Sequence, residues 1–169
     1  STIEFDQSGG GLVTFDVVTT TTDGSAADGE DDITLTATSG DLTISSASTG
    51  VAAGGLGDVN LTTITDGDIT LTGTTDAGAE VNILSASDID GAGLVTSPTV
   101  DLDAADGIGG SISLELAAST ISADNTSTGN IDIDNTNTLA TTVTSLTNAG
   151  GSTIEFDQSG GGLVTFDVV

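Results

Sequence analysis

The chain has 169 residues and carries 26 acidic side chains but no Lys, Arg or His, so its formal net charge is −26. A chain without cationic side chains cannot neutralise phosphates, which excludes nucleic-acid binding and attachment to anionic membranes. The chain also lacks Cys. Without His, Cys and Lys, it cannot use histidine bases, cysteine nucleophiles, Schiff-base lysines or disulfides. Membrane insertion is not expected either, because no run of about 18 apolar residues occurs.

A perfect duplication is the most informative feature of the sequence. The segment STIEFDQSGGGLVTFDVV occupies residues 1–18 and recurs without a substitution at residues 152–169, an offset of 151 residues. Long identical repeats are typical of arrays that build length. We therefore interpret residues 1–151 as one repeat unit and residues 152–169 as the start of the next. The two copies are expected to adopt the same conformation, related by a screw operation along the array.

Short segments that alternate aliphatic and polar residues follow one another along the chain. A period of two residues, rich in Ile, Val and Thr, predicts half-buried strands. Asp-Gly and Gly-Asp pairs between the segments predict tight turns. The predicted strands cover residues 33–36, 42–45, 59–62, 69–72, 81–83, 100–103, 112–116, 131–134, 154–157 and 164–167.

Three segments depart from this pattern: residues 19–32, 50–57 and 91–99. The first is rich in Asp and is expected to be an exposed acidic loop. The third carries the only proline of the chain, Pro98. Because proline cannot donate a ladder hydrogen bond, Pro98 predicts a corner rather than a central strand position.

The spacing of the strands indicates the fold class. Strand starts mostly follow at intervals of about 10 to 12 residues, and alternate starts such as Val59 and Val81 lie about 22 residues apart. This spacing predicts an all-β fold, a parallel β-helix (β-solenoid) of about seven coils per 151-residue repeat, which would advance about 34 Å. Tandem β-sandwich domains are the alternative, because regularly spaced turns are typical of them too.

The texture of the strands resembles a known class of surface protein. The segments GDITLTGTTDAGAEVNILSASDIDGAG and GNIDIDNTNTLATTVTSLTNAGGSTIEF are similar to the β-helical shafts of filamentous-haemagglutinin-type adhesins and related giant repetitive bacterial surface proteins. The similarity rests on a repeated G-D/N-I-x-L/I pattern over most of the chain. It implies a right-handed parallel β-helix in an extracellular or cell-surface location.

Carboxylates are the candidate binding groups. If the aliphatic residues face inward, the acidic residues between them face solvent, and carboxylates on neighbouring coils would lie about 5 Å apart. Carboxylate oxygens at that spacing suit Ca²⁺, although a solvated acidic surface that keeps fibres apart is the alternative. The predicted metal-binding residues are Asp101, Asp103, Asp132, Asp134, Glu155 and Asp157 on strands, and Asp23, Asp28, Glu30, Asp31 and Asp32 in the acidic loop.

These observations favour a structural role. Paired carboxylates can cleave glycosides, but the chain has no Arg or Lys to bind a sugar acid or stabilise charge, so no enzyme is expected. The sequence predicts a segment of an extracellular fibre or stalk whose main partner is itself, through identical repeats stacked end to end. Two alternatives remain: an adhesin module that presents residues 19–32 to a surface or glycan, and a calcium-stiffened array of tandem sandwich domains.

Overall fold

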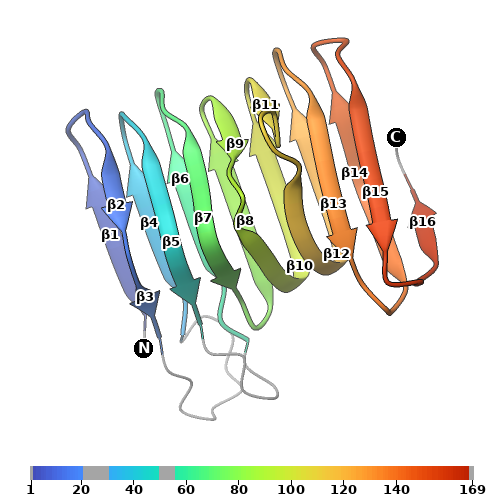
Figure 1. The fold of residues 1–169 in the computed structure, drawn as a ribbon. Helices are drawn as coiled ribbons and strands as arrows, with labels where there is room; N and C mark the ends of the chain where they lie inside the picture. The colour runs from blue at the N-terminus through green and yellow to red at the C-terminus, as the bar shows by residue number, and fades with distance from the viewer. Residues whose placement is uncertain (1, 21–30, 50–55, 168–169) are drawn as a thin grey trace.

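The chain forms a solenoid of stacked β-coils, as the computed structural model in Figure 1 shows. The structure describes residues 2–20, 31–49 and 56–167. These residues contain no helix, and therefore none that could cross a membrane. All strand pairs formed by the described residues are parallel. The predicted all-β solenoid is thus confirmed and the sandwich alternative is wrong, because a sandwich is built from antiparallel sheets.

Two long ladders face each other across the core. We call the first side A, and it contains β1 (Ile3–Gln7), β4 (Ile33–Ala37), β6 (Val59–Thr63), β8 (Glu80–Ser85), the second halves of β10 (Leu94–Ala104) and β12 (Leu114–Asn125), β14 (Thr141–Asn148) and β16 (Val164–Phe166). Side B contains β2 (Val13–Phe15), β5 (Leu42–Ser48), β7 (Ile69–Asp76), β9 (Asp88–Asp90), β11 (Gly107–Ile108), β13 (Ile131–Thr136) and β15 (Ile154–Ser159).

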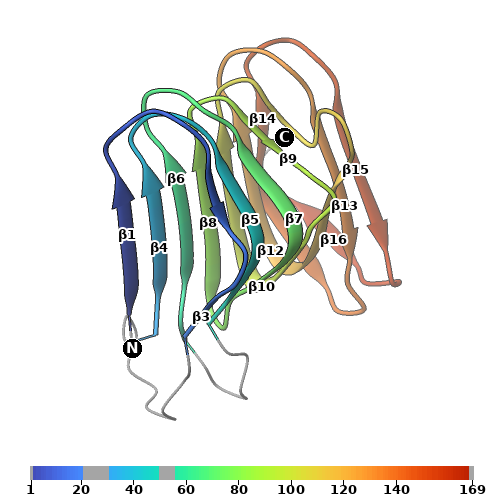
Figure 2. The same cartoon turned by 60° about the vertical axis from the view of Figure 1, so that its left-hand side comes forward.

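A shorter third ladder continues side B beyond a bulge. It joins β3 (Val18–Thr19), the ends of β5 and β7, and the first halves of β10 and β12. In Figure 2, which brings the N-terminal end toward the viewer, the chain rises through β1, crosses the top and descends through β2 while it recedes. Clockwise travel away from the viewer is a right-handed coil, as the resemblance implied.

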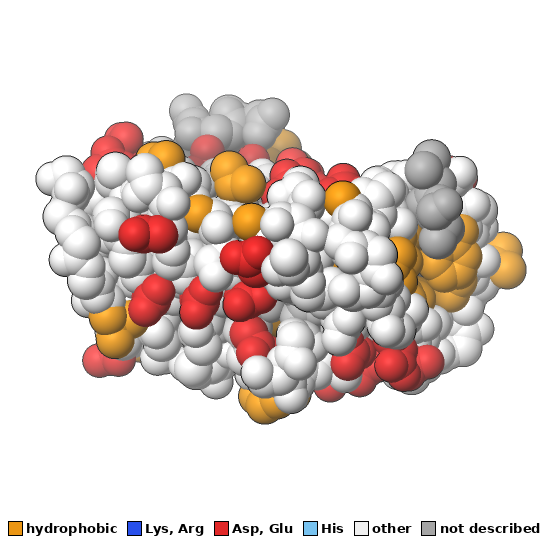
Figure 3. All heavy atoms as spheres, turned by 90° about the horizontal axis from the view of Figure 1, so that it is seen from above, with side chains coloured by type: hydrophobic (Ala, Val, Ile, Leu, Met, Phe, Trp, Pro, Cys, Tyr) orange, Lys and Arg blue, Asp and Glu red, His pale blue; other side chains and the backbone are white. Residues whose placement is uncertain are grey.

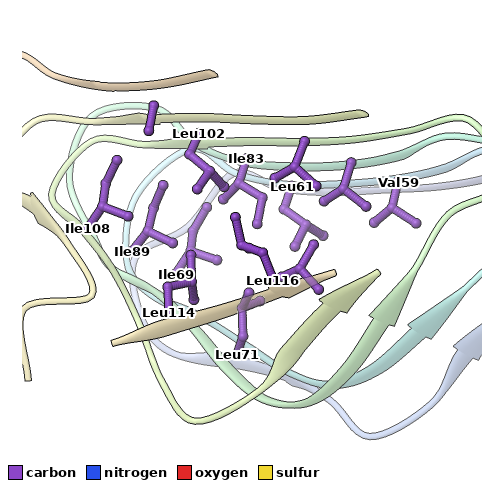
Figure 4. Close-up of a cluster of buried hydrophobic side chains, with 14 of the residues drawn as sticks. Val59, Leu61, Ile69, Leu71, Ile83, Ile89, Leu102, Ile108, Leu114 and Leu116 are labelled. Carbon is purple, nitrogen blue, oxygen red and sulfur yellow. The ribbon is translucent and has the colours of Figure 1, made fainter. Parts of the chain in front are cut away.

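Side-chain alternation places the core between the ladders. In β4 and β6 the first, third and fifth residues are buried and the residues between them are partly exposed. Figure 4 shows Leu61 and Ile83 from side A and Ile69 and Ile89 from side B with their side chains in one narrow interior, and each is at most 2% exposed. Stacking places most inward aliphatic side chains on aliphatic ones of the next coil, as Leu35 on Leu61, so the core consists mainly of apolar ladders. A few inward positions are polar, as where Leu116 is in register with the buried Asn135.

All four phenylalanines lie in the two end coils. The rings of Phe5 and Phe15 meet edge to face with centroids 5.0 Å apart, and those of Phe156 and Phe166 do so at 5.6 Å. Edge-to-face pairs of this kind are favoured by the ring quadrupole. Each end of the solenoid therefore has an aromatic pair that joins side A to side B across the core.

Two sequence predictions need correction around the corners. The sequence predicts that residues 91–99 lie outside the strands, yet β10 begins at Leu94. Pro98 does occupy a corner, because Pro98 and the next residue both face outward and so interrupt the alternation within β10. The strand predicted for residues 112–116 begins only at Leu114, and Ile112 is 52% exposed because it precedes the strand.

The number of coils between the two identical segments is six and a half. Ile3 begins the side A ladder, and the chain steps from there to Val13 on side B. The side B register then runs Val13, Leu42, Ile69, Ile89, Ile108, Ile131 and Ile154, which is six complete coils. The sequence prediction of about seven coils is close and differs by half a coil. At ~4.8 Å per coil, one repeat advances about 31 Å rather than about 34 Å.

Candidate functional surfaces

Aspartates at the corners hold neighbouring coils together. On side B, Asp41 Oδ1 accepts a hydrogen bond from the Asp68 backbone N–H at 3.0 Å, and Asp68 Oδ1 accepts one from the Asp88 N–H at 3.3 Å. Burial, followed by the charges of Asp68, Asp106 and Asp90, raises the pKa of the Asp88 carboxyl. The row therefore satisfies backbone donors at the corner while it concentrates negative charge there.

Side A has an equivalent row. Asp32 Oδ1 accepts from the Asp58 backbone N–H at 2.9 Å, and Asp58 Oδ1 accepts from the Glu80 N–H at 3.1 Å. Sequence reasoning assigned Asp32 to a metal-binding loop and did not detect this role. The signal was present, because Asp32 and Asp58 each stand immediately before the first inward aliphatic residue of a strand.

The carboxylates predicted to bind calcium are divided between the two sides. Asp101 and Asp103 lie on side A, where Asp103 is in register with Asp124 of the next coil and Asp101 with Ser122. Burial, followed by the charges of Asp101 and Asp124, raises the pKa of the Asp103 carboxyl. Carboxylates on adjacent coils therefore do oppose one another on side A, as the sequence predicted.

The other predicted strand carboxylates lie on side B. Asp132 is in register with Glu155 and Asp134 with Asp157. Glu115 precedes Asp134 in the same row. A shallow hollow of about 360 Å³ lies over this row, lined by Glu115, Asp134, Asn135, Thr136, Asp157, Gln158 and Ser159. The hollow is a polar groove with carboxylates from three successive strands of the ladder.

Calcium binding stays a prediction. Among the described residues, no group of three or more acidic side chains is arranged to hold a metal ion. Asp23, Asp28 and Glu30 lie outside the described residues, and Asp31 is only 5% exposed. Figure 3 shows carboxylates spread over the visible face rather than gathered at one point. This distribution supports a diffuse association with cations more than a single stoichiometric site.

The two ends of the solenoid form a second kind of candidate surface. Phe5 at the N-terminal end is 39% exposed and Phe166 at the C-terminal end is 47% exposed. Apolar side chains at the C-terminal end are also seen at the right of Figure 3. Within the described residues, β1 pairs only with β4 and β16 only with β14, and an unpaired strand edge is a template for pairing with another strand.

A buried amide network marks the C-terminal end. Asn135 is 1% exposed; its Nδ2 donates to the Gln158 Oε1 at 2.9 Å and to the Ala118 carbonyl at 3.1 Å, and its Oδ1 accepts from the Ala118 N–H at 3.0 Å. At the other end Gln7, the counterpart of Gln158, has a buried Oε1 with no hydrogen-bond partner within the described part of the chain. The same residue is thus satisfied in one copy and unsatisfied in the other.

Comparisons of the chain with models of known protein families, with curated proteins and with solved structures find no match. The stacked parallel coils are consistent with a β-helix shaft. The ladders, the corners and the ends of the solenoid are therefore the features from which a function can be inferred.

Proposed function

We propose that the chain is a structural, non-enzymatic segment of an extracellular or cell-surface fibre, in which identical repeats continue one solenoid from end to end. The observation that carries this proposal is the set of contacts made by the two copies of the duplicated segment. The N-terminal copy pairs with the strands that follow it, β1 with β4 and β2 with β5. The C-terminal copy pairs with the strands that precede it, β15 with β13 and β16 with β14.

The two sets of contacts are compatible in one coil. Ile154 is in register with Ile131, and its counterpart Ile3 is in register with Ile33. A junction coil with both neighbours would therefore continue an aliphatic ladder without a change of register. Every strand of that coil would have a hydrogen-bonded neighbour on each side, which removes the open edges.

The amide network gives independent support. Gln158 Oε1 accepts a hydrogen bond from Asn135, whereas the equivalent atom of Gln7 is buried without a partner among the described residues. An unsatisfied buried acceptor costs about 1–3 kcal/mol. A preceding repeat stacked beneath β1 would bring its own Asn135 to Gln7, in the arrangement that Gln158 already shows.

The surface chemistry supports a passive fibre. The chain carries 26 acidic side chains and no His, Cys, Lys or Arg, so histidine bases, cysteine nucleophiles and Schiff-base lysines are unavailable. Acidic faces keep such fibres hydrated and apart. The similarity of the strand texture to filamentous-haemagglutinin-type shafts supports the extracellular or cell-surface location.

Chains of one, two and three tandem repeats test this proposal by electron cryo-microscopy. We expect single rods with a continuous ~4.8 Å ladder, each repeat adding about 31 Å of length. Beads joined by gaps, or an increment that differs from about 31 Å by more than one coil spacing, would contradict the proposal.

A pair of matched variants tests the junction in the two-repeat chain. Phe156→Asp places a charge inside the junction coil and is expected to divide the rod into two bodies, which protease cleavage between the repeats would detect. Leu84→Asp introduces the same acidic side chain at an outward, 50% exposed position of side A and should leave the rod intact. Equal behaviour of the two variants would mean that the junction is not a packed coil.

A further inference from the structure

The two identical segments lie on opposite sides of the solenoid. The strand IEFDQ is β1 on side A in the first copy but part of β15 on side B in the second. The strand VTF is β2 on side B in the first copy but β16 on side A in the second. The exchange is complete, because both strands of the segment change sides together.

The exchange follows from the coil count. One step from side A to side B and six complete coils separate Ile3 from Ile154. The sequence repeat is therefore half a coil out of phase with the solenoid that it builds.

Both sides accept the segment because they offer the same inward pattern. Phe5 stacks on Leu35 of side A, and Phe156 stacks on Ile133 of side B. The two aromatic pairs keep nearly the same geometry, with interplanar angles of 83° and 82°. The local conformation of the strands is thus preserved while their place in the solenoid changes.

The triple-glycine turn between the two strands, in contrast, differs between the two copies. In the first copy Gly11 has a positive φ, whereas in the second copy Gly160 and Gly161 have one. Glycine adopts positive and negative φ about equally well. The prediction of one conformation for the two copies therefore holds for their strands and not for this turn.

We infer that a tandem array of this repeat is a two-fold screw, in which each repeat is turned by about half a revolution relative to the one before. This inference rests on the proposed end-to-end stacking and adds the relation between neighbouring copies. The sequence repeats with every copy, but the structure repeats only with every second copy, after thirteen coils and about 62 Å.

The consequence is a fibre without a single decorated face. Asp103 and Asp124 form an acidic pair on side A, and the same pair lies on the other side in the next repeat. Each row of carboxylates, each corner and each hollow is therefore presented alternately on opposite sides, about 31 Å apart along the axis. Such a fibre offers the same surface to neighbours on both sides.

Helical reconstruction by electron cryo-microscopy of a chain of six or more tandem repeats tests the inference. We expect a rise of about 31 Å with a rotation near 180°, so that the pattern repeats at about 62 Å. A continuous solenoid with a rotation near 0° and a rise of about 29 or 34 Å, corresponding to six or seven whole coils, would overturn the inference but leave the stacking proposal intact. Separate beads would overturn both.

Spin labels give an independent measurement, because the chain has no native Cys. Thr34→Cys in both halves of a two-repeat chain places one label per repeat at an outward position of side A in the first copy. Pairs within one repeat calibrate the distances: Thr34 with Ser122 lies on one side, and Thr34 with Asp132 spans both sides. The distance between repeats should exceed the axial advance of about 31 Å by the contribution of the solenoid's width. The Thr34–Ser122 pair shows the distance that results when two labels on one side are separated only along the axis. A distance between repeats that equals the axial advance alone would overturn the inference.

Discussion

Replacement of Asn135 by Ala should destabilise the C-terminal coils strongly. Asn135 is 1% exposed and forms hydrogen bonds to the Ala118 N–H, the Ala118 carbonyl, Thr141 and Gln158. The Ala118 carbonyl keeps a second donor, the Asn137 Nδ2 at 2.9 Å, so the main losses are at the Ala118 N–H and the Gln158 Oε1. Each buried group left unsatisfied costs about 1–3 kcal/mol, so for these two groups we expect a loss of about 2–6 kcal/mol in the free energy of unfolding.

The measurement is urea unfolding followed by circular dichroism, with Asn82→Ala as the control. Asn82 is also an asparagine in a strand, and its side chain donates to Asn60 at 3.0 Å, but it faces outward and is partly exposed. Loss of that bond should cost about 0.5–1 kcal/mol, because water replaces the partner. Equal losses in the two variants would refute the view that the buried amide network, rather than asparagine stacking in general, stabilises the coil.

Three further predictions concern the core, the charge and a turn. Leu61→Ala, at a fully buried position, should cost about 2–5 kcal/mol, whereas Leu84→Ala, half exposed on the same side, should stay within about 0.5 kcal/mol in the same unfolding assay. Because the pKa of Asp103 is raised in the folded state, the folded chain binds this proton more tightly than the unfolded chain. The thermal midpoint should therefore rise as the pH falls from 7 toward the ordinary Asp pKa of about 3.9. Asp103→Asn should make this rise smaller. The same pH profile in the variant and the parent chain would contradict the role assigned to Asp103. Gly129 has a φ of +83° and an added Cβ would lie 1.6 Å from the Asp106 carbonyl oxygen, so Gly129→Ala should lower the thermal midpoint clearly, while Gly110→Ala, with nothing within 4 Å, should not.

The sequence predicted the ladders better than the corners and the interior polar groups. Strands such as β4 and β6 were predictable because their alternation reports directly which residues face the core. The same rule places Ile112 in a strand, yet this residue is exposed, because hydrophobicity alone does not show where a strand begins. Asn135 could not be assigned as an inward residue from composition, because its burial depends on partners supplied by other coils.

The candidate site was predictable only in part for a related physical reason. Alternation indicated that Asp103 and Asp134 face outward, and the structure confirms this. It could not show that they lie on different sides, because a period of two residues carries no information about which ladder a strand joins. The spacing between strands carries that information weakly, since corner segments vary in length.

Variation in coil length explains how a half-coil repeat can persist. The first coil of side A, from Ile3 to Ile33, is the longest in sequence, and the coil from Val81 to Val100 is the shortest. Apart from one-residue shifts after Ile121 in β12 and after Ile44 in β5, the ladders keep their register, so most of the difference in coil length lies between the strands, where no ladder partner is needed. The energy of stacking depends on inward aliphatic side chains and paired backbone groups, and both sides supply these to the same segment. Nothing in the stacking therefore requires the repeat to contain a whole number of coils. A duplication of any length that returns an IEFDQ strand to either ladder is acceptable, and one that returns it to the opposite ladder yields alternating sides without a specific signal in the sequence.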